Sequence, residues 1–127
     1  MRAKKIRSKD APEPVGPYSQ AVLVGDTLFC SGQIALDPAT GVLVGKTAGE
    51  QAERALLNLK AVLREVGCDF SNVVKVTLYL KNMGDFAGVN EVYARYFGEN
   101  GPARSTVEVS RLPKDALVEI EAVASTT

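Results

Sequence analysis

The sequence predicts an α+β fold in which two helices cover one face of a six-stranded, mostly antiparallel sheet. Two segments repeat apolar residues at helical spacing, whereas the other regular segments alternate or have the composition of strands. Their order along the chain is β-β-β-α-β-α-β-β, which is typical of this fold class. We expect one domain, residues 1–127, large enough to bury roughly two-thirds of the surface of its unfolded chain.

Three strands are expected before the first helix. The basic segment 1–10 is expected to be a solvated edge strand, although a transit peptide or an RNA-binding patch would also explain its charge. Residues 18–35 read as two strands, with Gly25-Asp26 as the turn between them.

Both helices have start and stop signals. Thr47 and Glu50 have the spacing of a capping box, and apolar residues then repeat at helical spacing as far as Gly67. The second helix is expected to begin at Asp85 as N-cap and to end at Gly98.

The remaining strands are assigned to faces by their alternation, because successive side chains of a strand point to opposite sides. In the strand 74–81, one face is expected to pack against the helices, and its residues are Val74, Val76, Leu78 and Leu80. In the strand 104–111, we predict that Val107 and Val109 face the helices. The residues expected to face away from them are Arg104, Thr106, Glu108 and Ser110.

In the last strand, 117–124, Glu119 and Glu121 are expected on the side away from the helices, beside Leu117 and Val123. This open face of the sheet is neither fully polar nor fully apolar. A mixed face of this kind is typical of a subunit interface, so we expect a homo-oligomer.

Composition excludes several kinds of chemistry. Lys and Arg together number 15 and so do Asp and Glu, so there is no overall field to attract nucleic acid or an anionic membrane. The absence of histidine excludes Ser-His-Asp and Cys-His catalysis and imidazole metal sites. The two cysteines match neither a disulfide framework nor a zinc motif, so we expect a cytoplasmic protein with no metal.

Arg104 is the first candidate site residue, because a guanidinium group suits two-point binding of a carboxylate. Two interpretations remain open. Arg104 could bind a ligand, or it could pair across the hairpin with Glu119 or Glu121. One of these carboxylates could also transfer protons.

Four further residues belong to two short motifs. Tyr18 follows Gly16-Pro17 and could be directed into a site, or it could be an ordinary aromatic residue at the start of a strand. Ser31-Gly32 allows close backbone approach, as a ligand loop needs, but a plain bulge is an equal alternative. Cys30 is expected to be a small buried residue rather than a nucleophile.

Five stretches together resemble the RidA (YjgF-type) reactive intermediate deaminase family over nearly the whole chain. The stretches are GPYSQA, CSGQI, the helix ending at Gly67, NMGDFAGVNEVYARYF and PARSTVEVSRLPKDALVEIEAVA. The most specific part is P-A-R-S followed about a dozen residues later by V-E-I. The resemblance implies a chorismate-mutase-like fold, a homotrimer and sites in clefts between subunits.

The resemblance also implies hydrolysis of 2-imino acids, such as 2-iminobutanoate and 2-iminopropanoate, to 2-oxo acids and ammonia without a cofactor. It assigns carboxylate binding to Arg104 and the water or imine nitrogen to Glu119. Tyr18 and Ser31-Gly32 would line the pocket, with Tyr18 from the adjacent subunit. The rival functions are a non-enzymatic ligand-binding or chaperone-like trimer and, with less support, a ribonuclease or translation inhibitor.

One position departs from the family pattern. Many relatives have a cysteine two residues after the arginine, and this chain has Thr106 there. A catalytic thiol is therefore not expected, although the backbone of Thr106 could still bind the ligand. Glu108 and Glu121 are interpreted first as hairpin or interface charges.

Overall fold

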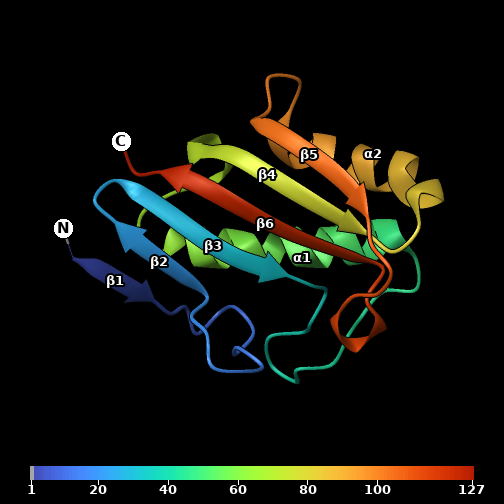
Figure 1. The fold of residues 1–127 in the computed structure, drawn as a ribbon, viewed down its shortest axis with the longest axis horizontal. Helices are drawn as coiled ribbons and strands as arrows, with labels where there is room; N and C mark the ends of the chain where they lie inside the picture. The colour runs from blue at the N-terminus through green and yellow to red at the C-terminus, as the bar shows by residue number, and fades with distance from the viewer. Residues whose placement is uncertain (1) are drawn as a thin grey trace.

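The computed structural model describes residues 2–127 and shows a six-stranded sheet with both helices on one face (Figure 1). The spatial order of the strands is β1-β2-β3-β6-β4-β5. β4 and β5 run parallel, and the other neighbouring pairs are antiparallel. The strands are β1 Ala3–Ile6, β2 Ala21–Val24, β3 Thr27–Gln33, β4 Val73–Leu80, β5 Ala103–Glu108 and β6 Val118–Ser125. The predicted fold class and element order are confirmed.

The helices are α1, Ala48–Arg64, and α2, Phe86–Phe97. They lie side by side behind the sheet in Figure 1, where α1 packs against β3 and β6. Three short 3-10 turns, Phe70–Asn72, Met83–Asp85 and Pro113–Asp115, join the larger elements.

The core lies between the helices and the sheet, and its packing follows the two periodicities of the sequence. Apolar side chains from one face of α1 meet the inward-facing residues of β3, β4 and β6. The largest fully buried apolar side chains are Leu28, Leu56, Leu59, Leu63, Leu78, Leu80, Ile120, Val62, Val76, Val89 and Val118. The opposite face of the sheet has no helix over it, and there Phe29 is 51% exposed.

Several local predictions are confirmed. β1 lies at the edge of the sheet beside β2. Gly25, with φ 60°, and Asp26 form the tight turn between β2 and β3. At the start of α1, the Thr47 side chain accepts a hydrogen bond from the Glu50 backbone N–H at 3.1 Å. The Glu50 carboxylate accepts from the backbone N–H of Lys46 rather than of Thr47, so the reciprocal half of the capping box is displaced by one residue.

The predicted face of Val74 is wrong. The pairing of β4 with β6 shifts register between Val73 and Lys75, which turns Val73 inward and leaves Val74 52% exposed. A bulge inserts one residue into the alternation, so the strict pattern of the sequence holds only from Val76 onward.

The predicted faces of β5 are also wrong. Paired residues of neighbouring strands lie on the same face of a sheet, and Arg104 pairs with the buried Val76 of β4. Arg104, and with it Thr106 and Glu108, therefore lies on the helix side, whereas Val107 is 40% exposed on the open side. β5 is an edge strand over the margin of the helix layer, where an arginine can lie against aromatic rings and keep access to solvent. Val109 and Ser110 lie beyond its end.

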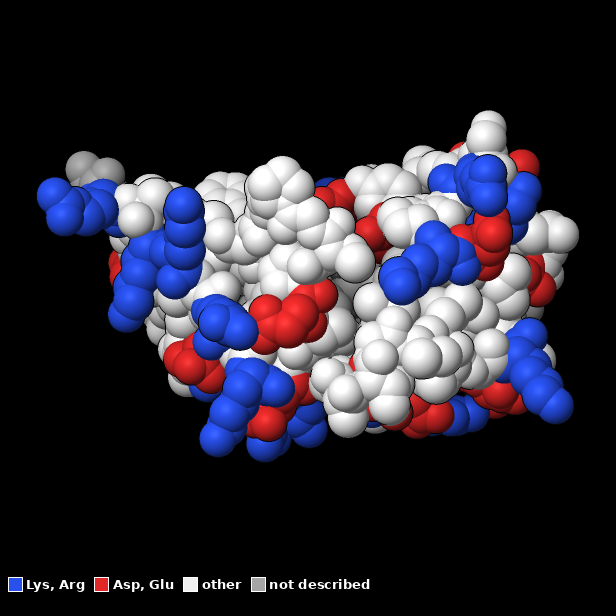
Figure 2. Space-filling model, turned by 90° about the horizontal axis from the view of Figure 1, so that it is seen from below, with Lys and Arg blue, Asp and Glu red and all other residues white. Residues whose placement is uncertain are grey.

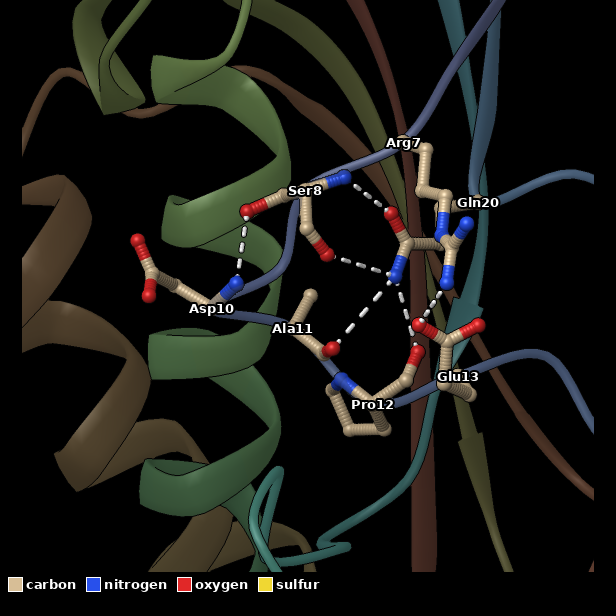
Figure 3. Close-up of polar contacts among 7 residues, drawn as sticks. All are labelled: Arg7, Ser8, Asp10, Ala11, Pro12, Glu13 and Gln20. Atoms are coloured by element: carbon tan, nitrogen blue, oxygen red, sulfur yellow. Dashed lines mark hydrogen bonds and ion pairs between the residues drawn. The ribbon is translucent and has the colours of Figure 1, made fainter.

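Three buried amide side chains attach loops to this framework. Asn58 of α1 donates to the carbonyl groups of Ile34 and Leu36, and Gln51 bonds both Gly45 and Leu117. The third amide, Gln20, holds the 8–12 segment that precedes the Tyr18 loop (Figure 3).

Gln20 is 2% exposed and uses both ends of its amide. Its oxygen accepts from the Ser8 backbone N–H at 2.6 Å, and its nitrogen donates to the carbonyl groups of Ser8 and Pro12 at 3.1 and 2.8 Å. Figure 3 shows these bonds converging on one side chain, which replaces the strand partners that this irregular segment lacks.

We expect Gln20→Leu to lower the free energy of unfolding by more than about 2 kcal/mol, because buried backbone groups would lose their partner at an apolar side chain of similar size. Denaturant unfolding followed by circular dichroism measures this change. Arg7→Ala is the control, since the ion pair of Arg7 with Glu13 in the same segment is exposed and should contribute far less than the Gln20 bonds. Equal losses in the two variants would contradict the assignment.

Candidate active site

The candidate site begins where the Glu119 side chain of β6 lies over Gly32 of β3. A β-carbon added to Gly32 would lie 2.5 Å from Glu119 Oε2 and 2.8 Å from its Cδ. The pairing of β3 and β6 shifts register between Cys30 and Gln33, so Gly32 lies in a bulge. The missing side chain therefore leaves room for the Glu119 carboxylate.

Tyr18 and Ser31 flank this carboxylate site. The Ser31 backbone N–H donates to Gln20 O at 2.9 Å, and its hydroxyl donates to Ser19 O at 2.6 Å, which fixes the loop between Gly16 and β2 against β3. Tyr18 belongs to that loop rather than to a strand, and its side chain is 49% exposed. Its ring is thus available to a ligand at the surface.

A small cavity of about 50 Å³ lies beside Tyr18, Gly32 and Glu119, and Ser31 is not among the residues that line it. It has both apolar and polar walls, from the segment 12–15, Tyr18, Gly32, Ile34, Leu36, Pro113 and Glu119. Tyr18, Gly32 and Glu119 were proposed from the sequence as site residues, and the structure places all three on this one cavity. The cavity is smaller than a typical small-molecule site.

The electrostatic environment of Glu119 favours proton transfer. Burial raises the pKa of Glu119 above its ordinary value, and the negative charge of Glu121 raises it further. The Tyr79 hydroxyl donates a hydrogen bond to Glu121 from the neighbouring strand. That bond and partial burial raise the pKa of Tyr79 to about 12, so Tyr79 stays neutral at pH 7.

Arg104 lies away from this group, on the helix side of β5. Its Nη1 donates to Asn90 Oδ1 of α2 at 2.8 Å. Its Cζ lies 4.8 Å from the ring centroid of Tyr93 and 5.4 Å from that of Phe86. Cation–π attraction and the hydrogen bond hold the guanidinium group in place without a carboxylate partner. The predicted alternative in which Arg104 pairs with Glu119 or Glu121 across the hairpin is wrong.

The structure therefore groups the predicted residues into two halves. Tyr18, Ser31, Gly32 and Glu119 form one half. Arg104 and the half-buried Thr106 form the other, on the opposite face of the sheet and with β4 between β5 and β6. Two strand spacings amount to roughly 10 Å, so the two halves of one chain do not converge on one small ligand.

Three residues that contact Arg104 were not predicted from the sequence. Phe86, Asn90 and Tyr93 lie on one face of α2 at helical spacing. An asparagine between two aromatic residues on one helix face was the available signal. Its partner could be found only with the register of β5 known.

Both cysteines are buried and free. Burial raises the pKa of the Cys30 thiol to about 12, with a smaller contribution from Cys68. The prediction that Cys30 is a small buried residue is confirmed, because it is only 5% exposed in the core.

Charge is mixed over the surface that Figure 2 shows, and Lys and Arg gather at the end of the molecule that carries β1. None of the helices within residues 2–127 is both long and apolar enough to cross a membrane. Over the same residues, no cluster of three or more His, Cys, Asp or Glu side chains is arranged to hold a metal ion.

The fold and the two half-sites define a small α+β protein with one part suited to carboxylate binding and another that carries a carboxylate of raised pKa. Residues 8–126 match the Endoribonuclease L-PSP family, and the chain belongs to this family, which includes the YjgF and RidA proteins. The resemblance recognised in the sequence is thereby confirmed.

Individual relatives cover almost the whole chain. The human 2-iminobutanoate/2-iminopropanoate deaminase is 50% identical over 119 residues, which are 94% of this chain and 87% of the human protein. Among solved structures, RidA from the Antarctic bacterium Psychrobacter is 41% identical with a TM-score of 0.92, covering 96% of this chain and 98% of that one. E. coli TdcF with bound serine is 40% identical with a TM-score of 0.92, covering 98% and 99%.

We expect Gly32→Ala to destabilise the protein by about 1–3 kcal/mol, because the new methyl group would displace the Glu119 carboxylate. The same substitution in a Glu119→Ala background should cost clearly less, since the group it meets is gone. Thermal and denaturant unfolding of the four proteins of this double-mutant cycle measure the coupling. A cost for Gly32→Ala that is the same in both backgrounds would show that Glu119 does not occupy this space.

Proposed function

We propose that the chain is a cytoplasmic deaminase that hydrolyses small 2-imino acids, such as 2-iminobutanoate and 2-iminopropanoate, to 2-oxo acids and ammonia. The main support is the combination of a guanidinium group held without a carboxylate partner and a partly buried carboxylate of raised pKa. Membership of a family with relatives that are named as this deaminase agrees with it.

Arg104 is the carboxylate anchor in this proposal. A 2-imino acid carries a carboxylate next to its C=N carbon, and two parallel N–H···O bonds from one guanidinium would fix both the position and the rotation of the substrate. The serine bound to E. coli TdcF has the same arrangement of a carboxylate next to a nitrogen-bearing carbon.

Glu119 is the proton-transfer group. Water adds to C2 of the protonated imine and gives a carbinolamine, and the C–N bond then breaks to release ammonia and the 2-oxo acid. Glu119 accepts a proton from the attacking water and returns it to the departing nitrogen. The proton of the carbinolamine hydroxyl is lost as the C=O bond forms and leaves with the nitrogen as ammonium. Its raised pKa suits both steps, because a group that titrates closer to the working pH can act as base and as acid.

The two halves must come from two copies of the chain. Arg104 and Glu119 lie on opposite faces of one sheet, so a neighbouring subunit would bring its Glu119, Gly32, Ser31 and Tyr18 to the Arg104 and Thr106 edge. We propose a homotrimer with three such sites. The open face carries the exposed Phe29 and half-buried valines, and packing against another subunit would cover them.

RNA cleavage is the second candidate, because the family description names an endoribonuclease. The sequence has no histidine and carries no net charge, whereas the phosphate backbone is bound by clustered cations. The half-sites offer one arginine and one carboxylate, a pair that fits a small zwitterion better than a polyanion. A non-enzymatic ligand-binding trimer would use the same anchor without turnover.

The test couples threonine dehydratase, which releases 2-iminobutanoate, to trapping of the imine by semicarbazide. We expect the protein to lower semicarbazone formation and to speed the release of 2-oxobutanoate. Arg104→Ala should lose at least roughly 100-fold in kcat/KM, because two charge-assisted hydrogen bonds are removed.

Arg111→Ala is the matched control, because Arg111 is exposed and paired with Asp115 near the same strand. It should keep wild-type activity. Equal trapping with and without the protein would refute the deaminase, and full activity of Arg104→Ala would refute the role of the anchor. The endoribonuclease would be favoured if both arginine variants cleaved RNA and the protein had no effect on trapping of the imine by semicarbazide.

A further inference from the structure

The side chain of Asn90 in α2 accepts a hydrogen bond from Arg104. The bond joins Arg104 Nη1 to Asn90 Oδ1 at 2.8 Å. Asn90 is half-buried, and asparagine is a poor helix former, so its place inside α2 brings no advantage to the helix itself. The contact crosses from the helix layer to the edge strand. It therefore orients Arg104 rather than stabilising α2.

The geometry of the guanidinium group determines what this contact leaves free. An arginine has five N–H donors, and a carboxylate pairs best with two parallel donors along one edge. Nη1 donates to Asn90, and no hydrogen bond of ordinary geometry joins Nε or Nη2 to a described residue, although the Tyr93 hydroxyl lies near the guanidinium group. The two rings of Phe86 and Tyr93 lie within 5.4 Å of Cζ and limit the tilt of the guanidinium plane.

We propose that Asn90 is a positioning residue that occupies the Nη1 corner of Arg104 and reserves the Nε–Nη2 edge for the two oxygens of the ligand carboxylate. The aromatic rings of α2 hold the plane of the group, and Asn90 sets its rotation within that plane. This inference rests on the proposed function, because it explains how the carboxylate anchor of that function is aimed.

The neutral amide of Asn90 is part of the inference. A carboxylate at this position would form its own ion pair with Arg104 and would compete with the charge of the ligand. The amide oxygen accepts the same hydrogen bond and leaves the positive charge of the guanidinium uncompensated. Residue 90 thus makes Arg104 selective for an anionic ligand group.

The experiment compares wild type, Asn90→Ala, Arg104→Ala and the double variant in a cycle. We expect Asn90→Ala to raise KM for the imino acid roughly tenfold, as loss of one hydrogen bond to a charged group predicts, with kcat changed by less than about twofold. In the Arg104→Ala background the same substitution should have no effect, because Asn90 acts only through that side chain.

Binding of 2-oxobutanoate, measured by titration calorimetry, gives a readout that does not depend on turnover. Asn90→Ala should weaken it by the same factor as it raises KM. Glu91→Ala is the matched control on the same helix. Glu91 is exposed, and within the described residues it forms an ion pair with Arg95 rather than with Arg104. It should change neither quantity. Melting temperatures of all variants identify any loss of folding, and alanine in place of asparagine favours the helix.

The outcomes separate the inference from the function. If the wild type binds 2-oxobutanoate but turns over no imine, a weaker affinity of Asn90→Ala that depends on Arg104 supports the inference while the deaminase fails. Asn90→Asp gives a second check, since it keeps the oxygen acceptor but should weaken binding at least as much as alanine does. Unchanged affinity in Asn90→Ala, or an equal effect with and without Arg104, would overturn the inference.

Discussion

The absence of a side chain at Gly32 is the constraint on which the candidate site depends. Any β-carbon there would collide with the Glu119 carboxylate, so the bulge of β3 and the position of Glu119 on β6 are parts of one arrangement. Placing the carboxylate in this gap removes it from water and raises its pKa. Partial burial of the Glu119 carboxylate lowers the stability of the folded chain, but it also gives Glu119 a pKa suited to proton transfer. Active sites commonly lose stability in this way.

The second constraint is the pairing of β5 with β4. The two strands are parallel, and Arg104 of β5 is paired with the buried Val76 of β4. Arg104 therefore lies against α2, on the face of the sheet opposite Glu119. The two charged groups are therefore held apart within a chain, which prevents them from neutralising each other. In the proposed function they meet across two copies, and the uncovered sheet face with its exposed Phe29 is the surface proposed for their association.

The sequence allowed most of the central strands and the core to be predicted, whereas the predicted faces of the edge strand β5 were wrong. In β6, alternation of Val118, Glu119 and Ile120 leaves only one way to bury the apolar residues, and the structure agrees. In β5 the helix side carries only the polar residues Arg104, Thr106 and Glu108, so the rule that apolar residues face the helices gives the wrong face, and the register depends on pairing with a strand that precedes α2. The contact of Asn90 with Arg104 could not be predicted without that register. The glycine at position 32 indicated a close approach, but its partner Glu119 is distant in the sequence.

Co-expression of two inactive variants tests most directly whether the site is shared between copies. Arg104→Ala and Glu119→Gln chains, each inactive alone, should assemble into mixed oligomers in which some interfaces combine an intact Arg104 with an intact Glu119. With equal amounts and random assembly into a closed ring, about a quarter of the interfaces have this combination, so we predict about a quarter of the wild-type activity. Mixed oligomers, verified by differently tagged chains, that remain as inactive as their parents would contradict a site divided between two subunits.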